Sequence, residues 1–167
     1  NSMAADPYLK QVVARTLEAG LRGTLSGNTQ WNAGVYRTLN TDDILFVGTS
    51  TSAGYFTNFG KTQRQGLELG LNGSLRGIDW FASYNWLHAT FRSDACLLGA
   101  NNSTRGTAAE CTGAGQDDEI FVKKGNRLPG LPEHTAKLGL SWRATDWLRL
   151  GGDVQAFSSQ YVRGNEN

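Results

Sequence analysis

Apolar and polar residues alternate without a break between Gly66 and Leu75. Odd positions carry leucines and one glycine, and even positions carry polar or small residues: Leu67, Leu69, Leu71, Gly73 and Leu75 against Gly66, Glu68, Gly70, Asn72 and Ser74. A period of two predicts a β-strand with one apolar and one polar face. A helix of the same sequence would scatter the leucines around its circumference.

Similar alternation elsewhere predicts an all-β chain of antiparallel up-and-down hairpins. The turns alternate between short and long, so the short turns should lie at one end of the sheet and the long connections at the other. We expect six strands, at residues 16–25, 30–47, 55–75, 79–92, 133–144 and 147–161. Residues 6–15 stay open, because Asp6 and Pro7 suit a helix start while the following residues also fit an extended chain.

The tryptophans indicate what the apolar face meets. Four of the 5 lie within about three residues of a predicted short turn: Trp31, Trp80, Trp142 and Trp147. Amphipathic rings gathered at one level of a sheet are typical of a membrane–water interface. We therefore interpret these four residues as membrane-interface aromatics. A soluble antiparallel barrel or sandwich with surface aromatics is the alternative.

The other face should line a wet, wide lumen, because its polar residues would make a poor solvent-free core. Arg64 and Glu68 share this face and could pair across to neighbouring strands. The residues expected on it are Glu18, Arg22, Arg37, Arg64, Glu68, Asn72, Asn85, Lys137, Ser141 and Asp153.

Six strands are too few for a transmembrane barrel, since the smallest common ones have eight. Open strand edges are not tolerated in lipid. The chain should therefore be part of a longer one, or several copies should complete the wall. Residues 1–11 lack the basic start and apolar core of a signal peptide, which favours the first option.

Composition and charge exclude other classes of protein. Hydrophobic residues make up 39% of the chain, and no run of 18 apolar residues occurs, which excludes a helical membrane protein. A net charge of +1 gives no reason to expect nucleic acid as a partner.

Few residues suggest chemistry of their own. Cys96 and Cys111 lie in the loop-like segment 93–131, where we expect them to form a disulfide in an oxidising compartment. His88 and His134 lack a neighbouring ligand at metal spacing, and Asp117–Glu119 lacks the pattern of a calcium loop. No nucleophile is paired with a base. We expect no enzyme, no metal and no cofactor.

Several motifs resemble one family. Residues 58–68 place Asn58, Gly60, Lys61, Thr62 and Arg64 in an N-x-G-K-T-x-R order before Gly66 and Glu68. This stretch resembles a barrel strand of TonB-dependent outer-membrane receptors. Further similar stretches follow in the family's order, at residues 21–23, 35–38, 84–87, 89–91, 125–130, 132–134 and 160–166.

The resemblance implies a large, about 22-stranded transmembrane β-barrel in the bacterial outer membrane, occluded by an N-terminal plug. It implies active import of scarce, bulky nutrients, most often ferric siderophores, with energy from the TonB complex. Expected partners are outer-membrane lipid, the plug and remaining strands of the receptor, the TonB complex, and a ferric-siderophore-type ligand.

The chain itself should hold part of the barrel and no plug. Its long loops, Asp42 to Tyr55 and Ser93 to Leu131, would face outside and help to capture substrate. A passive outer-membrane porin or adhesin-type barrel remains the alternative transport class.

Overall fold

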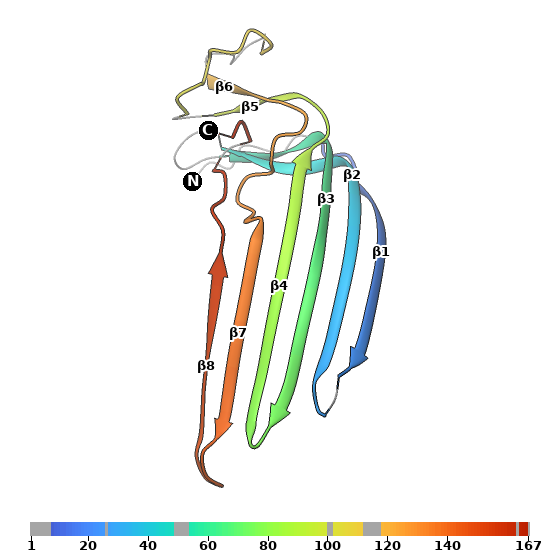
Figure 1. The fold of residues 1–167 in the computed structure, drawn as a ribbon. Coiled ribbons are helices and arrows are strands. Elements are labelled where there is room, and N and C mark those ends of the chain that lie inside the picture. The colour runs from blue at the N-terminus through green and yellow to red at the C-terminus, as the bar shows by residue number, and fades with distance from the viewer. Residues whose placement is uncertain are drawn as a thin grey trace.

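Six strands form one antiparallel sheet in the computed structural model, which describes residues 8–25, 27–48, 54–99, 102–111, 118–162 and 164–166 (Figure 1). The strand order is β1-β2-β3-β4-β7-β8, and β5 and β6 form a separate two-stranded sheet. The all-β fold class is confirmed. The strands are β1 (Val13–Thr24), β2 (Gln30–Gly48), β3 (Gly54–Leu75), β4 (Ile78–Phe91), β5 (Ala95–Leu98), β6 (Glu119–Val122), β7 (His134–Arg143) and β8 (Arg149–Phe157).

The long strands stand side by side as a curved wall (Figure 1). The short turns lie together at its lower end, and β5 and β6 lie beyond its upper end, which we call the rim. The tightest turn joins β3 to β4 through Arg76 and Gly77, whose φ angles are 50° and 79°. Two successive positive φ values are typical of the type I′ turn that suits twisted hairpins.

The structure differs from the sequence-based expectations in three places. β1 begins at Val13, and residues 8–12 of the open segment are neither helix nor strand. Segment 93–131 contains β5 and β6 where a single loop was expected. β2 and β3 extend one residue beyond the expected strands 30–47 and 55–75, to the pair Gly48–Gly54, so much of the segment Asp42 to Tyr55, also expected as an outer loop, lies in this ladder. Within the described residues, no helix is long and apolar enough to span a membrane.

Strand register assigns each residue to a face, because directly opposite residues of an antiparallel pair share one. Leu69 is opposite Ala33 and Tyr84, whereas Glu68 is opposite Gly34 and Asn85. We call the face of Leu69 the apolar face and that of Glu68 the polar face. Apolar side chains on the first are largely uncovered: the exposed fraction is 79% for Leu17 and 71% for Val154.

The expected position of Arg37 was wrong. Arg37 is directly opposite Leu17 on β1 and Gln65 on β3, so it belongs to the apolar face. The reason is the period of two itself. Trp31 and Val35 lie on the apolar face, and Arg37 is two residues beyond Val35.

Four aromatic rings cover glycines on the neighbouring strand. The direct pairs are Trp31–Gly23, Tyr36–Gly66, Trp80–Gly73 and Phe81–Gly139. In each pair the ring lies within about 3 Å of the place a Cβ atom would take on the glycine. The rings thus fill space that neighbouring side chains would otherwise leave open, in a sheet that has no second layer.

The hydrophobic core lies at the rim and not between layers. It consists of Phe59, Ala89, Phe91, Ile120, Val122 and Leu128. Ala89 and Phe91 follow Asn85 at even spacing along β4, so this core covers the upper part of the polar face.

Replacing Gly66 with alanine should destabilise the sheet by about 1–3 kcal/mol, because the new Cβ would lie 2.5 Å from the Trp86 carbonyl oxygen and against the Tyr36 ring. Gly152→Ala is the matched control, since its Cβ would meet nothing within 4 Å. The midpoint of thermal unfolding, followed by circular dichroism, measures both. Equal midpoints for the two variants would contradict this account of the glycine.

Candidate functional site

The β2–β3 hairpin bends at the rim, where Asp42 has a φ of 53°. Aspartate tolerates this left-handed conformation better than most residues. Asn58 fixes the bend from the opposite strand. Its amide nitrogen donates to the Asp42 carbonyl oxygen at 2.7 Å and to the Lys10 carbonyl oxygen at 3.0 Å, and its carbonyl oxygen accepts from the Lys10 N–H at 2.6 Å. Above the bend the hairpin leans across the upper end of the sheet (Figure 1).

A buried carboxylate lies directly beside the bend. Asp43 is 7% exposed and accepts hydrogen bonds from Asn40 at 3.1 Å, from the Thr62 hydroxyl and from the Arg64 guanidinium at 3.2 Å. We call these four residues the Asp43 cluster. Burial alone would raise the pKa of Asp43, but the hydrogen bonds from Thr62 and Asn40, together with the positive charge of Arg64, hold it below its usual value.

Gly60 permits close contact between the hairpin and the chain that follows β4. A Cβ at this position would collide with the Ser93 side chain. The Ser93 hydroxyl accepts a hydrogen bond from the Lys61 N–H at 3.0 Å, and the Arg92 N–H donates to the Lys61 carbonyl oxygen at 2.8 Å. The N-x-G-K-T-x-R motif therefore builds this bend and fixes it to residues 92–93.

The segment after β4 folds back onto the rim, and we call its described part, within residues 92–131, the cap. The Phe59 and Phe91 rings contact each other with centroids 4.7 Å apart. Ile120 and Val122 of β6 are almost completely buried against the same cluster. Burial of these side chains, rather than regular pairing with the main sheet, attaches the cap to the wall.

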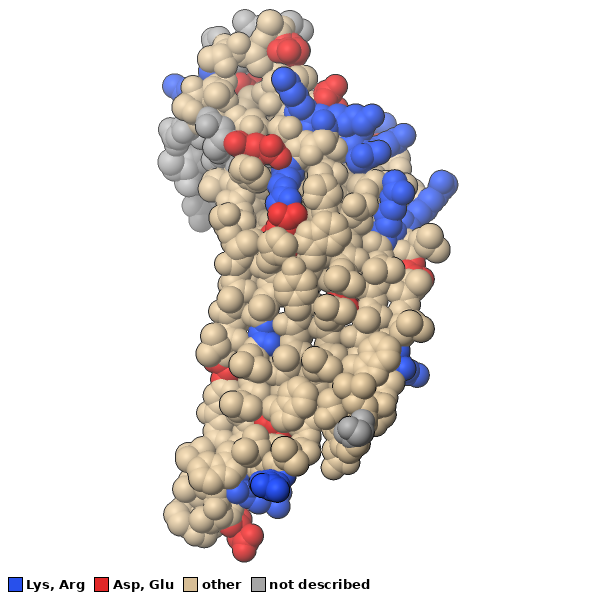
Figure 2. Space-filling view, viewed as in Figure 1, with Lys and Arg blue, Asp and Glu red and all other residues tan. Residues whose placement is uncertain are grey.

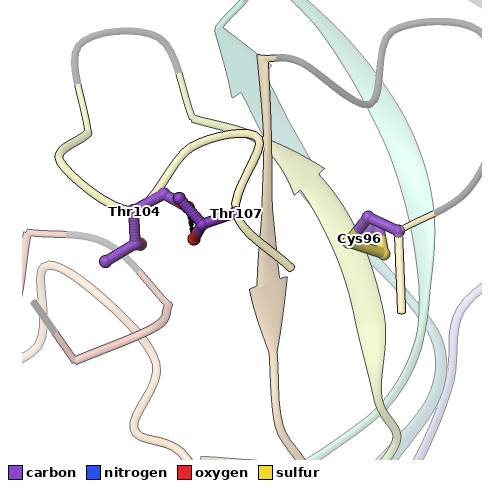
Figure 3. The surroundings of a disulfide bond; sticks show 4 residues. Cys96, Thr104 and Thr107 are labelled. Atoms are coloured by element: carbon purple, nitrogen blue, oxygen red, sulfur yellow. Dashed lines mark hydrogen bonds between the residues drawn. A yellow bond between two sulfur atoms is a disulfide. The ribbon is translucent and has the colours of Figure 1, made fainter. Parts of the chain in front are cut away.

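A disulfide joins Cys96 to Cys111 within the cap. Figure 3 shows Cys96 at this bridge, with Thr104 and Thr107 elsewhere in the same segment, where the Thr107 hydroxyl donates to the Thr104 carbonyl oxygen at 2.7 Å. Among the described residues, the one group spaced to hold a metal comprises the two cysteines and Glu119. Its sulfurs are bonded to each other, so it offers no thiolate ligand.

The chain after β8 is also fixed to the cap. Asn126 donates to the Gly164 carbonyl oxygen at 3.0 Å, and the Arg127 N–H donates to the Glu166 carboxylate at 2.7 Å. Gly164 is buried against the Phe91 and Val122 side chains. The motifs at 125–130 and 160–166, far apart in sequence, therefore meet at one place.

Glu133 joins the cap to the wall on the apolar-face side. It pairs with the Arg127 guanidinium and accepts a hydrogen bond from the Trp86 indole N–H at 3.2 Å. The hydrogen bond from Arg127 holds the pKa of Glu133 below its usual range. His88 and His134 each lie 3.9 Å from one of its oxygens. The structure thus gathers two histidines that sequence spacing had left apart.

Strand register places the expected lumen residues Arg64, Glu68, Asn72, Asn85 and Lys137 on the polar face. They do not form one cluster. Arg64 pairs with Asp43, whereas Lys137 lies 3.7 Å from Asp153 on β8.

The expected interface tryptophans lie toward the short turns. Trp31 and Trp80 lie over glycines, while Trp142 and Trp147 are 49% and 84% exposed. Asp117 of the acidic run falls outside the described residues.

Comparison with protein families decides the assignment. The family model described as "TonB dependent receptor-like, beta-barrel" matches residues 1–167. The chain belongs to the TonB-dependent receptor β-barrel family. The resemblance inferred from the motifs is thereby confirmed, and the porin and soluble-module alternatives are set aside. TonB-dependent receptors are transporters of the outer membrane and not enzymes.

The motifs at residues 58–64, 89–91 and 125–130 of this TonB-dependent receptor chain thus meet at the rim, whereas those at 21–23, 35–38 and 84–87 lie in the wall. Two acidic residues lie at the centre of the rim contacts. Asp43 carries no signal of its own in the sequence, and Glu133 stands out only as part of the motif at 132–134. Asp43 lies where the alternation of β2 breaks down, and Glu133 precedes a strand. A buried partner for Arg64 could have been sought from the motif, because an arginine in a polar stretch requires an acid or water.

Acidification should weaken the bend through Asp43. Because its folded pKa lies below the unfolded value, its stabilisation is present above an unfolded pKa of about 4 and is lost as the pH falls through the folded pKa. Asp43→Asn should therefore be less stable than the parent at pH 7, and the difference should shrink below about pH 4.

Thermal unfolding midpoints between pH 7 and pH 2.5 measure this effect. Asp153→Asn is the control, because this carboxylate is exposed and its ion pair with Lys137 is long, at 3.7 Å. A gap between parent and Asp43→Asn that stays constant at all pH values would rule out the proposed role of the charge.

Proposed function

We propose that this chain forms six strands of the barrel wall of an outer-membrane receptor that imports a ferric siderophore with energy from TonB. The observation that carries the proposal is the convergence of several of the family's motifs on one rim, above a sheet with two chemically opposite faces. A transporter needs such a wall, with lipid on one side and a water-filled or plugged lumen on the other.

The apolar face is proposed to contact lipid. Between Leu67 and Leu75 its positions on β3 are leucine or glycine, a band of about nine residues and roughly 30 Å. A transmembrane strand needs 9–11 residues. In this arrangement the four tryptophans would lie where the membrane meets water on the side of the short turns. This supports the proposed role of Trp31, Trp80, Trp142 and Trp147 as interface aromatics.

The polar face is proposed to line the lumen, where Glu68, Asn72, Asn85 and Lys137 would meet water or the plug. Arg64 lies higher, in the Asp43 cluster at the rim. The cap covers the upper part of this face, where Ile120 and Val122 of the cap lie in one cluster with Ala89 and Phe91 of β4. It is therefore placed to restrict the outer opening and to contact a bulky substrate before it enters.

The rest of the wall must come from further strands. Within the described residues, β1 pairs only with β2, and β8 pairs only with β7. Unpaired backbone groups in lipid cost several kcal/mol each. The proposal therefore requires the remaining strands and the plug of the same receptor as partners.

A charge at the centre of the apolar face should impair membrane insertion. Leu71→Lys should cost about 2–4 kcal/mol, as lipid-facing lysines do near the bilayer midplane. Asn72→Lys, the adjacent residue on the polar face, is the matched control and should cost far less. The fraction of heat-modifiable, folded receptor in outer membranes reports both, and equal losses would contradict the assignment of faces.

Iron uptake tests the transport function directly. Cells that depend on the complete receptor for iron should accumulate ⁵⁵Fe from at least one ferric siderophore of a chemically diverse panel, and cells lacking TonB should not. Uptake independent of TonB would overturn energy coupling. Uptake of a different nutrient, with none of any ferric siderophore, would leave the receptor class intact but refute the substrate.

A further inference from the structure

Three cations stand on the apolar face directly above its apolar band. The three are Arg15 on β1, Arg37 on β2 and Lys61 on β3. A row is a line of directly opposite residues across the strands, and the three cations occupy successive rows of the apolar face. The pairs that define these rows are Arg15–Leu39, Arg37–Gln65 and Lys61–Thr41. We call the three cations the basic triad. Same-face rows are about 7 Å apart and strands about 4.8 Å apart, so the triad occupies a small area of the outer surface.

The charge on this side of the sheet is not balanced. In the paired strands that the structure describes, the apolar-face positions below the bend carry no Asp or Glu, and the acidic residues Glu18, Glu68, Asp79 and Asp153 all lie on the polar face. The triad side chains are exposed, and none forms an ion pair with a described residue. Figure 2 shows Lys and Arg gathered over the upper ends of β1, β2 and β3.

Part of the triad is also held in position. The Arg37 guanidinium donates to the Gln63 side-chain oxygen at 3.0 Å, and the Gln63 amide donates to Gln65 at 2.8 Å. Gln63 is only 6% exposed. This row of side chains directs Arg37 along the surface, where its planar guanidinium has further N–H groups that can donate to two oxygens of a phosphate.

We propose that the basic triad binds the phosphate of an outer-leaflet lipid headgroup. The inference rests on the proposed function, in which the apolar face contacts lipid. The row of Arg37 lies immediately above the row of Val35, Leu67 and Trp86, so the triad begins where the acyl chains end and the headgroups lie. Anionic headgroups and cations at this depth attract each other. The carboxylate described on this side of the wall, Glu133, is already paired with Arg127 and not with the triad.

The experiment uses the complete receptor, purified in neutral detergent and examined by native mass spectrometry. The probes are phosphatidic acid, phosphatidylcholine and oleic acid, which share acyl chains but carry a phosphate monoester, a zwitterion and a carboxylate. The parent should retain phosphatidic acid most tightly. Replacing all three cations, as Arg15→Gln, Arg37→Gln and Lys61→Gln, should weaken that binding by about fivefold for each cation removed.

The matched control carries Arg22→Gln and Lys137→Gln, which remove two cations from the polar face. It should bind phosphatidic acid like the parent. Equal loss in the control, unchanged binding in the triple variant, or equally tight oleic acid would overturn the proposal. Displacement of the lipid by millimolar inorganic phosphate would assign the site to a soluble anion instead.

The same samples separate this inference from the proposed function. Heat-modifiable mobility reports whether each variant is a folded barrel. A folded triple variant that transports iron but keeps its lipid preference would refute the phosphate site alone. Normal insertion of Leu71→Lys would refute the lipid-facing assignment, and with it both proposals.

Discussion

The backbone hydrogen bonds of this sheet run from strand to strand, so each strand depends on a neighbour at both sides. β2, β3, β4 and β7 have two neighbours, and the two outer strands have one each among the described residues. In the described part of the chain, no second layer covers either face below the rim. A sheet with this architecture can be stable only when lipid replaces the missing layer on one face and further strands close its edges. The separation of apolar and polar residues onto opposite faces of the sheet follows from that requirement.

Where packing is needed, the chain concentrates it at the rim. Below the rim, rings over glycines fill the surface of a single layer, and leucines remain uncovered, as the proposed contact with lipid requires. At the rim, the bend, the cap and the chain after β8 converge on the cluster around Phe91 and Ile120. Several of the family's motifs lie here, because this is where the chain must leave the regular ladder. Regular alternation can be built from many residue types. The bend, by contrast, requires a residue that tolerates a positive φ at Asp42 and a residue without a side chain at Gly60.

Much of the wall could be predicted from the sequence, because a period of two is a local property. The leucine rows, the short turns and the disulfide partners follow from pattern and spacing alone. The error over Arg37 came from judging a residue by its charge and not by its place in the alternation. The Asp43 cluster and the contacts of Glu133 could not be predicted, because they join residues from separate strands through a bend that no periodicity describes. The pairing of β5 with β6 was missed for a similar reason: four-residue strands are too short to show alternation.

The position of the cap along the chain has a consequence for how such receptors diversify. β4 and β7 pair directly with each other down to Ile78 and Trp142, although the whole of residues 92–131 lies between them in the sequence. The ladder is continuous as though the insertion were absent. The insertion leaves β4 after Phe91 and enters β7 at His134, on adjacent strands at the same end of the wall, so a segment of different length or composition could be grafted there without shifting a single strand pair. Substrate recognition could then change by exchange of a module, while the membrane-spanning part is inherited intact.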